Sequence, residues 1–288
     1  MSRCGMGLVW VLVMSLGAES PRSAWAEPKT PSKPKAVSES FAGLDGVFDG
    51  YPRLNDRSPP VVCMLNCEPT DYLRDLKKKP AGLRKMMTLK SRIGELSGLS
   101  CLPVHYTQIT RHALDRPNVK AIVIVAWLPM KDKFHREDLL AMIRETKIPT
   151  IAFCGGHQKI CEAYGAKTNY MRKLRPDEKD PHPAYNPGFY KEWGTLPVQI
   201  VKRDPIFDGL PAECLMPQRH VAEVKTLPAE LNLLASSPEC KIQAVRHRDR
   251  PVYGTQFHPE IYDKDNPHGR ILLQNFFKLA GTPSATRQ

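Results

Sequence analysis

The stretch IPTIAFCGGHQKICEAYGA, residues 148–166, changes within a few positions from strand-forming residues to a helical pattern. Cys154 stands at the change and is followed directly by Gly155 and Gly156. An apolar strand that turns sharply into a helix through small residues is typical of a nucleophile elbow, which holds one side chain in a strained, exposed position. The positive end of the helix dipole favours a thiolate there, and free N–H groups of the turn can bind an oxyanion. The stretch therefore predicts a reactive cysteine at the end of a buried strand.

This strand is one of several in an alternation of strands and helices that begins near residue 59. Strands separated by helices at such intervals predict an α/β domain whose mostly parallel central sheet is flanked by helices. Residues 167–195 interrupt the alternation with prolines, charges and aromatic residues, which predicts a long loop or flap beside a site. The expected strands cover 59–65, 101–106, 119–128, 148–154, 196–202, 213–224, 231–237, 241–247 and 251–257, and the expected helices cover 83–98, 107–114, 136–147 and 268–281.

A base for the thiol is found late in the chain, in PVYGTQFHPEIY, residues 251–262. In an extended backbone, side chains two residues apart point the same way, so Glu260 can orient the imidazole of His258. The other ring nitrogen is then free to face the sulfur of Cys154. The two segments together predict a triad of cysteine, histidine and carboxylate.

These two segments resemble the marks of the class I glutamine amidotransferase family, a G-x-C-x-G-x-Q elbow and a late Q-F-H-P-E run. The elbow reads AFCGGHQ at 152–158 and the late run reads QFHPE at 256–260. The resemblance extends from about residue 60 to 281 and includes FDGLPAE, LPAELNLLASS and HGRILLQNF in the family's order. It implies a flavodoxin-like class I glutamine amidotransferase domain over 59–281.

The resemblance also implies a role for each matching residue. Cys154 would attack a γ-carboxamide, with His258 as acid and base and Glu260 as the group that orients it. Gln158 would lie beside the bound glutamine, and the N–H of Gly155 would form part of the oxyanion hole. A γ-glutamyl thioester would form and be hydrolysed by water, with no cofactor.

The sequence departs from the family pattern at three places. Ala152 replaces the first glycine of the elbow, a small change that keeps the turn. The loop after the third strand, usually glycine-rich, reads AWLP at 126–129, so the second oxyanion donor falls to the N–H of Trp127 or Leu128, or the hole is weakened. Arg219 precedes His220 where the family commonly has Ser-His near the substrate, which favours recognition of an extra carboxylate.

The first residues of the chain predict export. Residues 1–26 combine a basic start, an apolar run of about a dozen residues and a small-residue cleavage site near Ala26, which is typical of a secretory signal peptide. Residues 27–58 are rich in Pro, Ser and Lys and predict a flexible linker, and 282–288 form a short tail. We therefore expect a periplasmic or extracellular protein with no membrane span in its mature form.

Composition limits the kinds of partner and crosslink that are expected. The net charge is +12, but the basic residues are scattered and lack interleaved aromatics, so a solvated surface is expected rather than nucleic-acid binding. Of eight cysteines, Cys4 lies in the leader, and the odd number that remains predicts disulfides, Cys63 and Cys67 among them, with one thiol left free. The spacing of Cys154, His157 and Cys161 is a poor match to a metal site, and no metal is expected.

Three functions remain open from the sequence. The preferred one is a thiol amidohydrolase that hydrolyses the γ-amide of glutamine or a γ-glutamyl compound, because export makes an ATP-using acceptor a poor fit. The second is a ligand-binding or sensing domain whose altered oxyanion loop has cost it turnover. The third is an ammonia-donating subunit for a separate synthase, a partner that we expect less.

Overall fold

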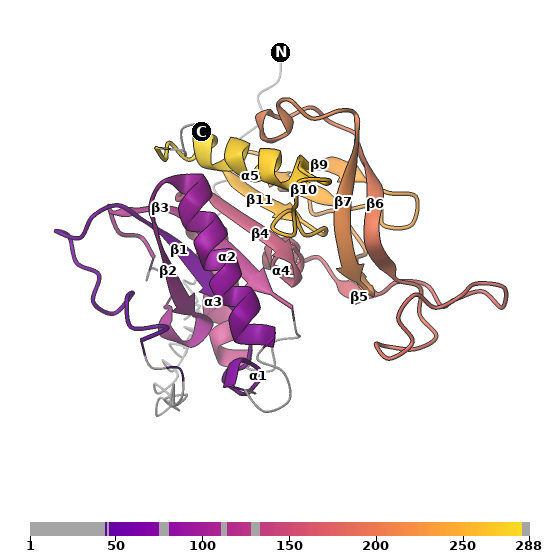
Figure 1. The fold of residues 1–288 in the computed structure, drawn as a ribbon, viewed down its shortest axis with the longest axis horizontal. Helices are drawn as coiled ribbons and strands as arrows, with labels where there is room; N and C mark the ends of the chain where they lie inside the picture. The colour runs from indigo at the N-terminus through magenta and orange to yellow at the C-terminus, as the bar shows by residue number, and fades with distance from the viewer. Residues whose placement is uncertain (1–43, 45, 75–80, 111–113, 128–132, 284–288) are drawn as a thin grey trace, which may run out of the picture. The chain divides into compact units, whose positions relative to one another are not determined.

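Nine strands form the central sheet within the described residues, 44, 46–74, 81–110, 114–127 and 133–283 of a computed structural model (Figure 1). Their order across the sheet is β2-β1-β3-β4-β11-β10-β9-β6-β7. The bounds are β1 Val61–Asn66, β2 Ser100–His105, β3 Val119–Ala126, β4 Thr150–Cys154, β6 Glu192–Ile200, β7 Glu213–His220, β9 Leu231–Ser236, β10 Ala244–His247 and β11 Val252–Thr255.

The sheet is mixed, with most of its strands running the same way. β2, β1, β3, β4 and β11 pair parallel with one another. β10, β9, β6 and β7 continue the sheet through antiparallel pairs, so that β10 and β6 run against the others. The expectation of a mostly parallel sheet is confirmed, and its parallel half carries the carboxyl ends of β4 and β11 at one edge.

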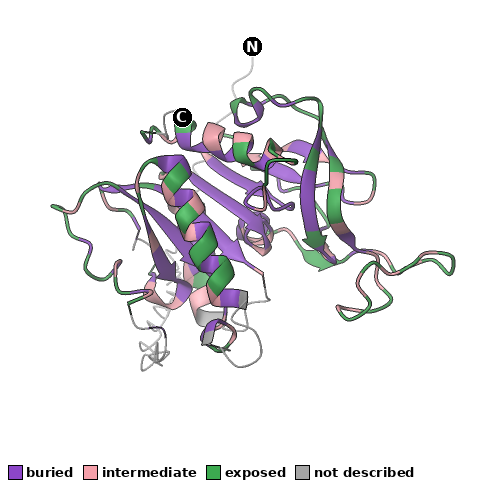
Figure 2. Ribbon diagram, in the orientation of Figure 1, coloured by how far each residue is buried: buried purple, intermediate pink, exposed green. Residues whose placement is uncertain are grey.

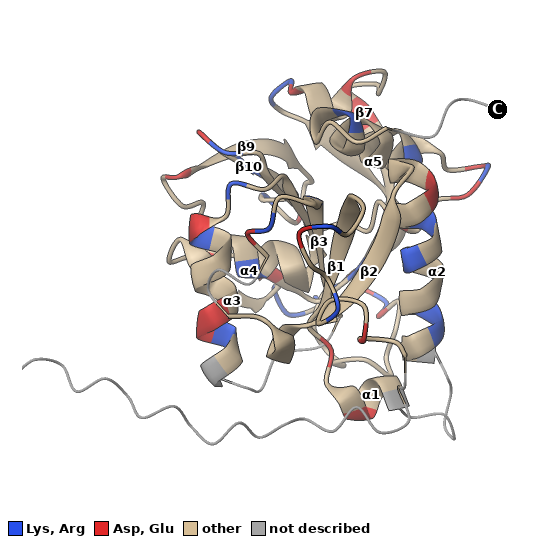
Figure 3. Ribbon diagram, turned by 90° about the vertical axis from the view of Figure 1, so that its left-hand side faces the viewer, with Lys and Arg blue, Asp and Glu red and all other residues tan. Residues whose placement is uncertain are grey.

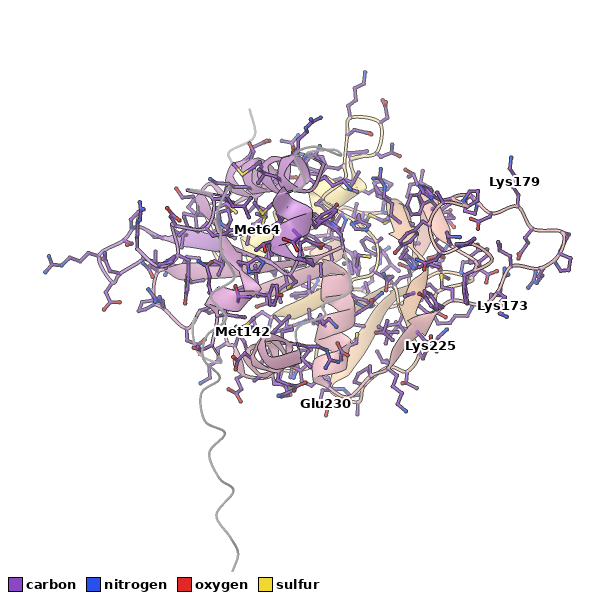
Figure 4. The ribbon with its side chains drawn as sticks, turned by 90° about the horizontal axis from the view of Figure 1, so that it is seen from below. Met64, Met142, Lys173, Lys179, Lys225 and Glu230 are labelled. Atoms are coloured by element: carbon purple, nitrogen blue, oxygen red, sulfur yellow. The ribbon has the colours of Figure 1, made fainter. Side chains whose placement is uncertain are left out.

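Helices cover both faces of the sheet, as the views in Figures 1 and 3 show. α2 (Ala81–Ser97) and α5 (His268–Leu279) pack on one face, and α3 (Lys133–Glu145) and α4 (Gly155–Ala163) pack on the other. Figure 4 labels one methionine from each core, Met64 on β1 and Met142 on α3. Figure 2 shows the parallel strands of the sheet buried and the outer sides of the helices exposed, as expected where a sheet is covered on both faces, whereas β6 and β7 are partly exposed.

Shorter elements complete the described structure. α1 (Thr70–Arg74) follows β1, and β5 (Thr168–Tyr170) pairs with β8 (Ala222–Val224) in a separate two-stranded sheet. The prediction of a helix at 107–114 is wrong in its first part. A 3₁₀ turn, Tyr106–Gln108, is followed there by Ile109, which is extended and buried. Burial of Ile109 in the core favours the extended backbone there, and 111–113 lie outside the described residues.

The predicted linker, residues 27–58, is corrected in its second half. Leu44, Phe48, Tyr51 and Leu54 are buried in the two cores, with Phe48 only 1% exposed. The few large apolar groups of this segment are therefore enough to attach it to the domain. The expected signal peptide, 1–26, lies outside the described residues, among which no helix is both long enough and apolar enough to cross a membrane.

The flap between β5 and β6 is held by ion pairs. Arg172 donates to Glu178 at 2.6 and 2.7 Å and to Glu239 at 3.0 and 2.9 Å. Lys191 pairs with Asp180 at 2.8 Å. Figure 4 shows Lys173 and Lys179 on this excursion, which extends away from the sheet. These charges fix the base of the flap and leave its outer part to solvent.

Candidate active site

Cys154 stands at the abrupt turn between β4 and α4. Its backbone has φ 48° and ψ −109°, a strained conformation for a residue other than glycine, as in a nucleophile elbow. A Cβ on Gly155 would lie 2.4 Å from the carbonyl oxygen of Ala126, and one on Gly156 would lie 2.7 Å from that of Ile124. Both positions therefore require glycine because α4 starts against the backbone of β3.

The segment after β11 brings the base to the same edge of the sheet. The N–H of His258 donates to the carbonyl of Pro217 at 2.8 Å, and the guanidinium of Arg92 from α2 donates to the carbonyl of Glu260. A Cβ on Gly269 would lie 2.2 Å from the carbonyl oxygen of Pro259, so the first turn of α5 closes directly onto this segment. Contacts from β7, α2 and α5 thus fix the position of His258.

The imidazole of His258 lies between an acid and the thiol. Nδ1 is 2.7 Å from Oε1 of Glu260, and both side chains are buried. Burial lowers the pKa of His258, but the Glu260 carboxylate and a hydrogen bond to the Cys154 sulfur outweigh it and raise the pKa to about 10. The structure therefore places the three residues of the predicted triad together and favours an imidazolium beside the sulfur.

Two glutamines connect to Cys154, and the sequence assigns a role to only one of them. Gln158 lines the pocket and donates to the carbonyl of Ala222 at 3.2 Å and to Oε1 of Gln256 at 3.1 Å. Nε2 of Gln256 lies 3.6 Å from Sγ of Cys154, within reach of a hydrogen bond to sulfur. The signal for Gln256 was present as the first letter of QFHPE, but its contact with the thiol depends on the fold.

The two oxyanion donors expected from the sequence differ in the structure. The N–H of Gly155 belongs to the first turn of α4, where backbone donors have no partner within the helix. The N–H of Trp127 instead donates to the carboxylate of Glu68, which follows β1 and is fully buried. Leu128 lies outside the described residues. As the structure stands, Trp127 lines the pocket with its N–H engaged elsewhere.

A cavity of about 540 Å³ opens beside Cys154. None of its described lining residues is acidic, whereas Lys159, Arg219 and His220 line it. Lys159 pairs with Glu162 at 2.6 Å, a carboxylate that Arg136 also contacts, but Arg219 forms no ion pair with a carboxylate in the described part of the chain. Further lining residues are Gly155, Gln158, Thr168, Asn169, Tyr170, Tyr185, Asn186, Val221 and Ala222. The cavity therefore suits an anionic ligand.

The aromatic residues of the predicted flap, 167–195, differ in whether they line the pocket. Tyr170 and Tyr185 line the cavity. Tyr190 instead lies under the guanidinium of Arg172, 4.2 Å from its ring centroid, and Trp193 packs on His182 at 4.4 Å. Tyr190 and Trp193 therefore pack within the flap and do not line the pocket.

His220 lines the pocket and belongs to a buried polar cluster. Its Nδ1 lies 3.1 Å from the carbonyl oxygen of Ala222, and its Nε2 lies 2.9 Å from Oε2 of Glu192. The Glu192 carboxylate also accepts from Ser237 and Gln243, each at 2.5 Å. With Cys240, Glu192 and His220 form the group of possible metal ligands found among the described residues. Because both oxygens of the carboxylate already have hydrogen-bond partners, we interpret the cluster as a hydrogen-bonded support for His220.

The cysteines do not form the expected disulfides. All seven cysteines in the described part of the chain are free thiols and buried. Burial raises the pKa of Cys63 to about 12 and that of Cys214 to about 11, and it also raises the pKa of Cys67, Cys101, Cys161 and Cys240. These thiols pack as small apolar groups in the cores, which explains their number without crosslinks.

Comparisons with known proteins point to one family. The family model for glutamine amidotransferase class-I matches residues 102–280. The chain is 31% identical over 164 residues to a glutamine-hydrolyzing GMP synthase subunit of Pyrococcus abyssi, covering 57% of this chain and 77% of that one. The corresponding protein of Pyrococcus furiosus is 30% identical over 162 residues, 56% of this chain and 76% of that one. A crystal structure from Thermoplasma acidophilum, described as that of a GMP synthase subunit, shares the fold with TM-score 0.55, 22% identity and coverage of 78% and 95%.

Proposed function

Because the chain belongs to the class I glutamine amidotransferase family, we propose that it hydrolyses the γ-amide of glutamine through Cys154. The thiolate attacks the γ-carbonyl carbon, and the oxyanion is bound by the N–H of Gly155. The His258 imidazolium gives its proton to the leaving nitrogen as the C–N bond breaks, which releases ammonia and leaves a γ-glutamyl thioester. His258 then takes a proton from water, which attacks the thioester and releases glutamate and the thiolate.

One observation carries the proposal, the convergence of the strained Cys154 with the His258–Glu260 pair. The 2.7 Å contact between His258 and Glu260 fixes the ring so that its other nitrogen serves the sulfur. A buried structural cysteine would need neither the strained backbone nor the charged partner. The arrangement is therefore suited to nucleophilic catalysis at a carboxamide.

The test is direct. Purified protein incubated with glutamine is expected to release glutamate and ammonia in equal amounts, and Cys154→Ser is expected to abolish release. Rapid quenching followed by mass spectrometry should find a γ-glutamyl adduct on the peptide that contains Cys154. Tight glutamine binding without release would instead support the sensing domain, the second function left open by the sequence.

The similar proteins favour the use of the ammonia by a separate synthase. The two Pyrococcus relatives described above are named as one subunit of a glutamine-hydrolyzing GMP synthase. This supports the ammonia-donating alternative over the stand-alone γ-glutamyl hydrolase that the sequence alone favours. A synthase subunit that raises glutamine turnover when mixed with this protein would support it, and equal turnover of glutamine and γ-glutamyl peptides without a partner would contradict it.

Arg219 is proposed to bind a carboxylate of the substrate, with His220 beside it. Arg219 lines the cavity without a counter-ion in the described part of the chain, and its guanidinium fork matches a carboxylate. Arg219→Gln is expected to raise KM for glutamine about tenfold with kcat nearly unchanged, as for a lost charged hydrogen bond. An unchanged KM would show that Arg219 is a solvated surface residue.

A further inference from the structure

We propose that Gln256 is a catalytic residue that stabilises the thiolate of Cys154 by donating a hydrogen bond to its sulfur. Nε2 of Gln256 lies 3.6 Å from Sγ of Cys154, and Gln256 is fully buried. The inference rests on the proposed function only in taking Cys154 as the nucleophile. It adds a neutral donor to the helix dipole and the His258 imidazolium as a source of stabilisation for the sulfur anion.

The hydrogen-bond pattern fixes which end of the Gln256 amide faces the sulfur. The carbonyl of Ala222 can only accept, so the atom of Gln158 that contacts it at 3.2 Å must be the amide nitrogen. That same nitrogen lies 3.1 Å from Gln256, where an oxygen must therefore receive its second proton. The NH₂ group of Gln256 is left to point at Cys154. The polarity of both amides thus follows from one backbone carbonyl.

The main chain of Gln256 is held as well as its side chain. Its N–H, two residues before the catalytic His258, donates to the carbonyl of Gln243 at 2.8 Å. A reversed amide would place an oxygen against the thiolate and two NH₂ groups against each other, at a buried position where unsatisfied groups are costly. The donor therefore does not need to reorganise when the sulfur becomes charged, which is the condition for effective electrostatic stabilisation.

A purely structural glutamine would also fill this space, so the test must measure the sulfur itself. Alkylation of the full-length protein by iodoacetamide follows the thiolate, and mass spectrometry of the peptide with Cys154 separates its alkylation from that of the other cysteines. Gln256→Met removes the donor at similar size and is expected to move the midpoint of the alkylation profile up by about one pH unit. Gln256→Glu, which is isosteric, is expected to move it further because a carboxylate opposes the thiolate.

Gln158 provides the matched comparison. Gln158→Met removes the group that orients Gln256 and leaves the donor in place, so it is expected to shift the profile less than Gln256→Met. In the Gln256→Met background, the same Gln158 change is expected to have no further effect, since both act through one bond. A second shift of equal size would show that the two glutamines act separately.

Two results would overturn the proposal. An alkylation profile of folded Gln256→Met that coincides with that of the unchanged protein would make Gln256 a packing residue. If Gln256→Met fails to fold, Gln256→Glu alone tests the proposal. An unchanged midpoint of its alkylation profile would likewise make Gln256 a packing residue. Because alkylation needs no substrate, failure to hydrolyse glutamine would refute the proposed function and leave this result standing.

Discussion

The carboxyl ends of β4 and β3 lie side by side, Cys154 paired with Ala126, and yet they prepare the site in opposite ways. At the end of β4, local residues create a strained turn with a free helical N–H at Gly155. At the end of β3, the next N–H, that of Trp127, is taken by Glu68 from the loop after β1. One half of the proposed oxyanion site is thus built by neighbours in sequence, and the other is controlled by a distant carboxylate.

The difference shows that the turn at Cys154 and the neighbouring loop after β3 depend on different kinds of contact. The elbow depends on small residues that let the start of α4 approach the backbone of β3, and a few adjacent residues in the sequence are enough for this. The β3 side depends on a buried acid that competes for a backbone donor. Changes at the two strand ends should therefore have opposite signs, and the following predictions test that contrast from the largest effect to the smallest.

Gly155→Ala is expected to cause the largest loss. The new Cβ would lie 2.4 Å from the carbonyl oxygen of Ala126, so β3 and α4 must separate and the N–H at the elbow is displaced. We expect kcat/KM for glutamine to fall about 10³-fold, as for loss of an oxyanion donor. Gly94→Ala in α2 is the control, since its Cβ would make an ordinary 3.5 Å contact. Equal activity of the two variants would show that the elbow tolerates a side chain.

Glu260→Gln should weaken catalysis at the end of β4, because Glu260 holds His258, the proposed base for Cys154. Burial lowers the pKa of His258, and the Glu260 carboxylate with the Cys154 sulfur raises it to about 10, so removing the charge lowers it. We expect kcat/KM to fall about 10²-fold and its alkaline limb to move to lower pH. The histidine also stabilises the fold below pH 6.5, an effect lost as pH rises towards 10. An unchanged pH–rate profile would contradict this role.

Glu68→Met should act in the opposite direction. Methionine keeps the length of the buried side chain but cannot accept the N–H of Trp127, so this donor is released at the end of β3. We expect kcat for glutamine to rise about tenfold, less than the full value of an oxyanion donor because the loop must still turn. Glu68→Gln, which keeps an acceptor oxygen, should give a smaller change. A fall in kcat for Glu68→Met alone would show that the carboxylate supports the active arrangement.

The smallest expected effect concerns stability at the first turn of α4. Burial lowers the pKa of His157 from 6.5 to about 4, so the folded protein holds this ring neutral while the unfolded chain protonates it. The free energy of unfolding should therefore fall as pH falls from about 6.5 to about 4. Urea unfolding across this range should show a shallower fall for His157→Gln. Parallel curves would place the acid sensitivity elsewhere, for example at the end of β3.

Local patterns predicted the elements that position the triad. Apolar runs gave β1, β3 and β4 within two residues at each end, because buried parallel strands are continuous in sequence. Cys154, His258 and Glu260 come together because each lies at or just beyond the end of a parallel strand of the same sheet.

The remaining features depend on contacts between distant residues. The N–H of Trp127 meets Glu68 across 59 residues, and Gln256 meets Cys154 across 102. No periodicity encodes such pairs. Likewise, the proline and lysine content of 27–58 predicts a linker, although Phe48 and Tyr51 are enough to bury part of this segment. Composition describes an average, whereas burial is decided by single large side chains.

The contact between Gly269 and Pro259 also sets an order of events for the newly made chain. The ribosome delivers the reactive sulfur first and its histidine only 104 residues later, 258 less 154, and α5 must then dock before that histidine is fixed. A nascent polypeptide therefore carries the thiol without its histidine while these 104 residues are added. We therefore expect activity to begin when α5 docks, so a ribosome-stalled chain that ends before Gly269 should be inert towards glutamine.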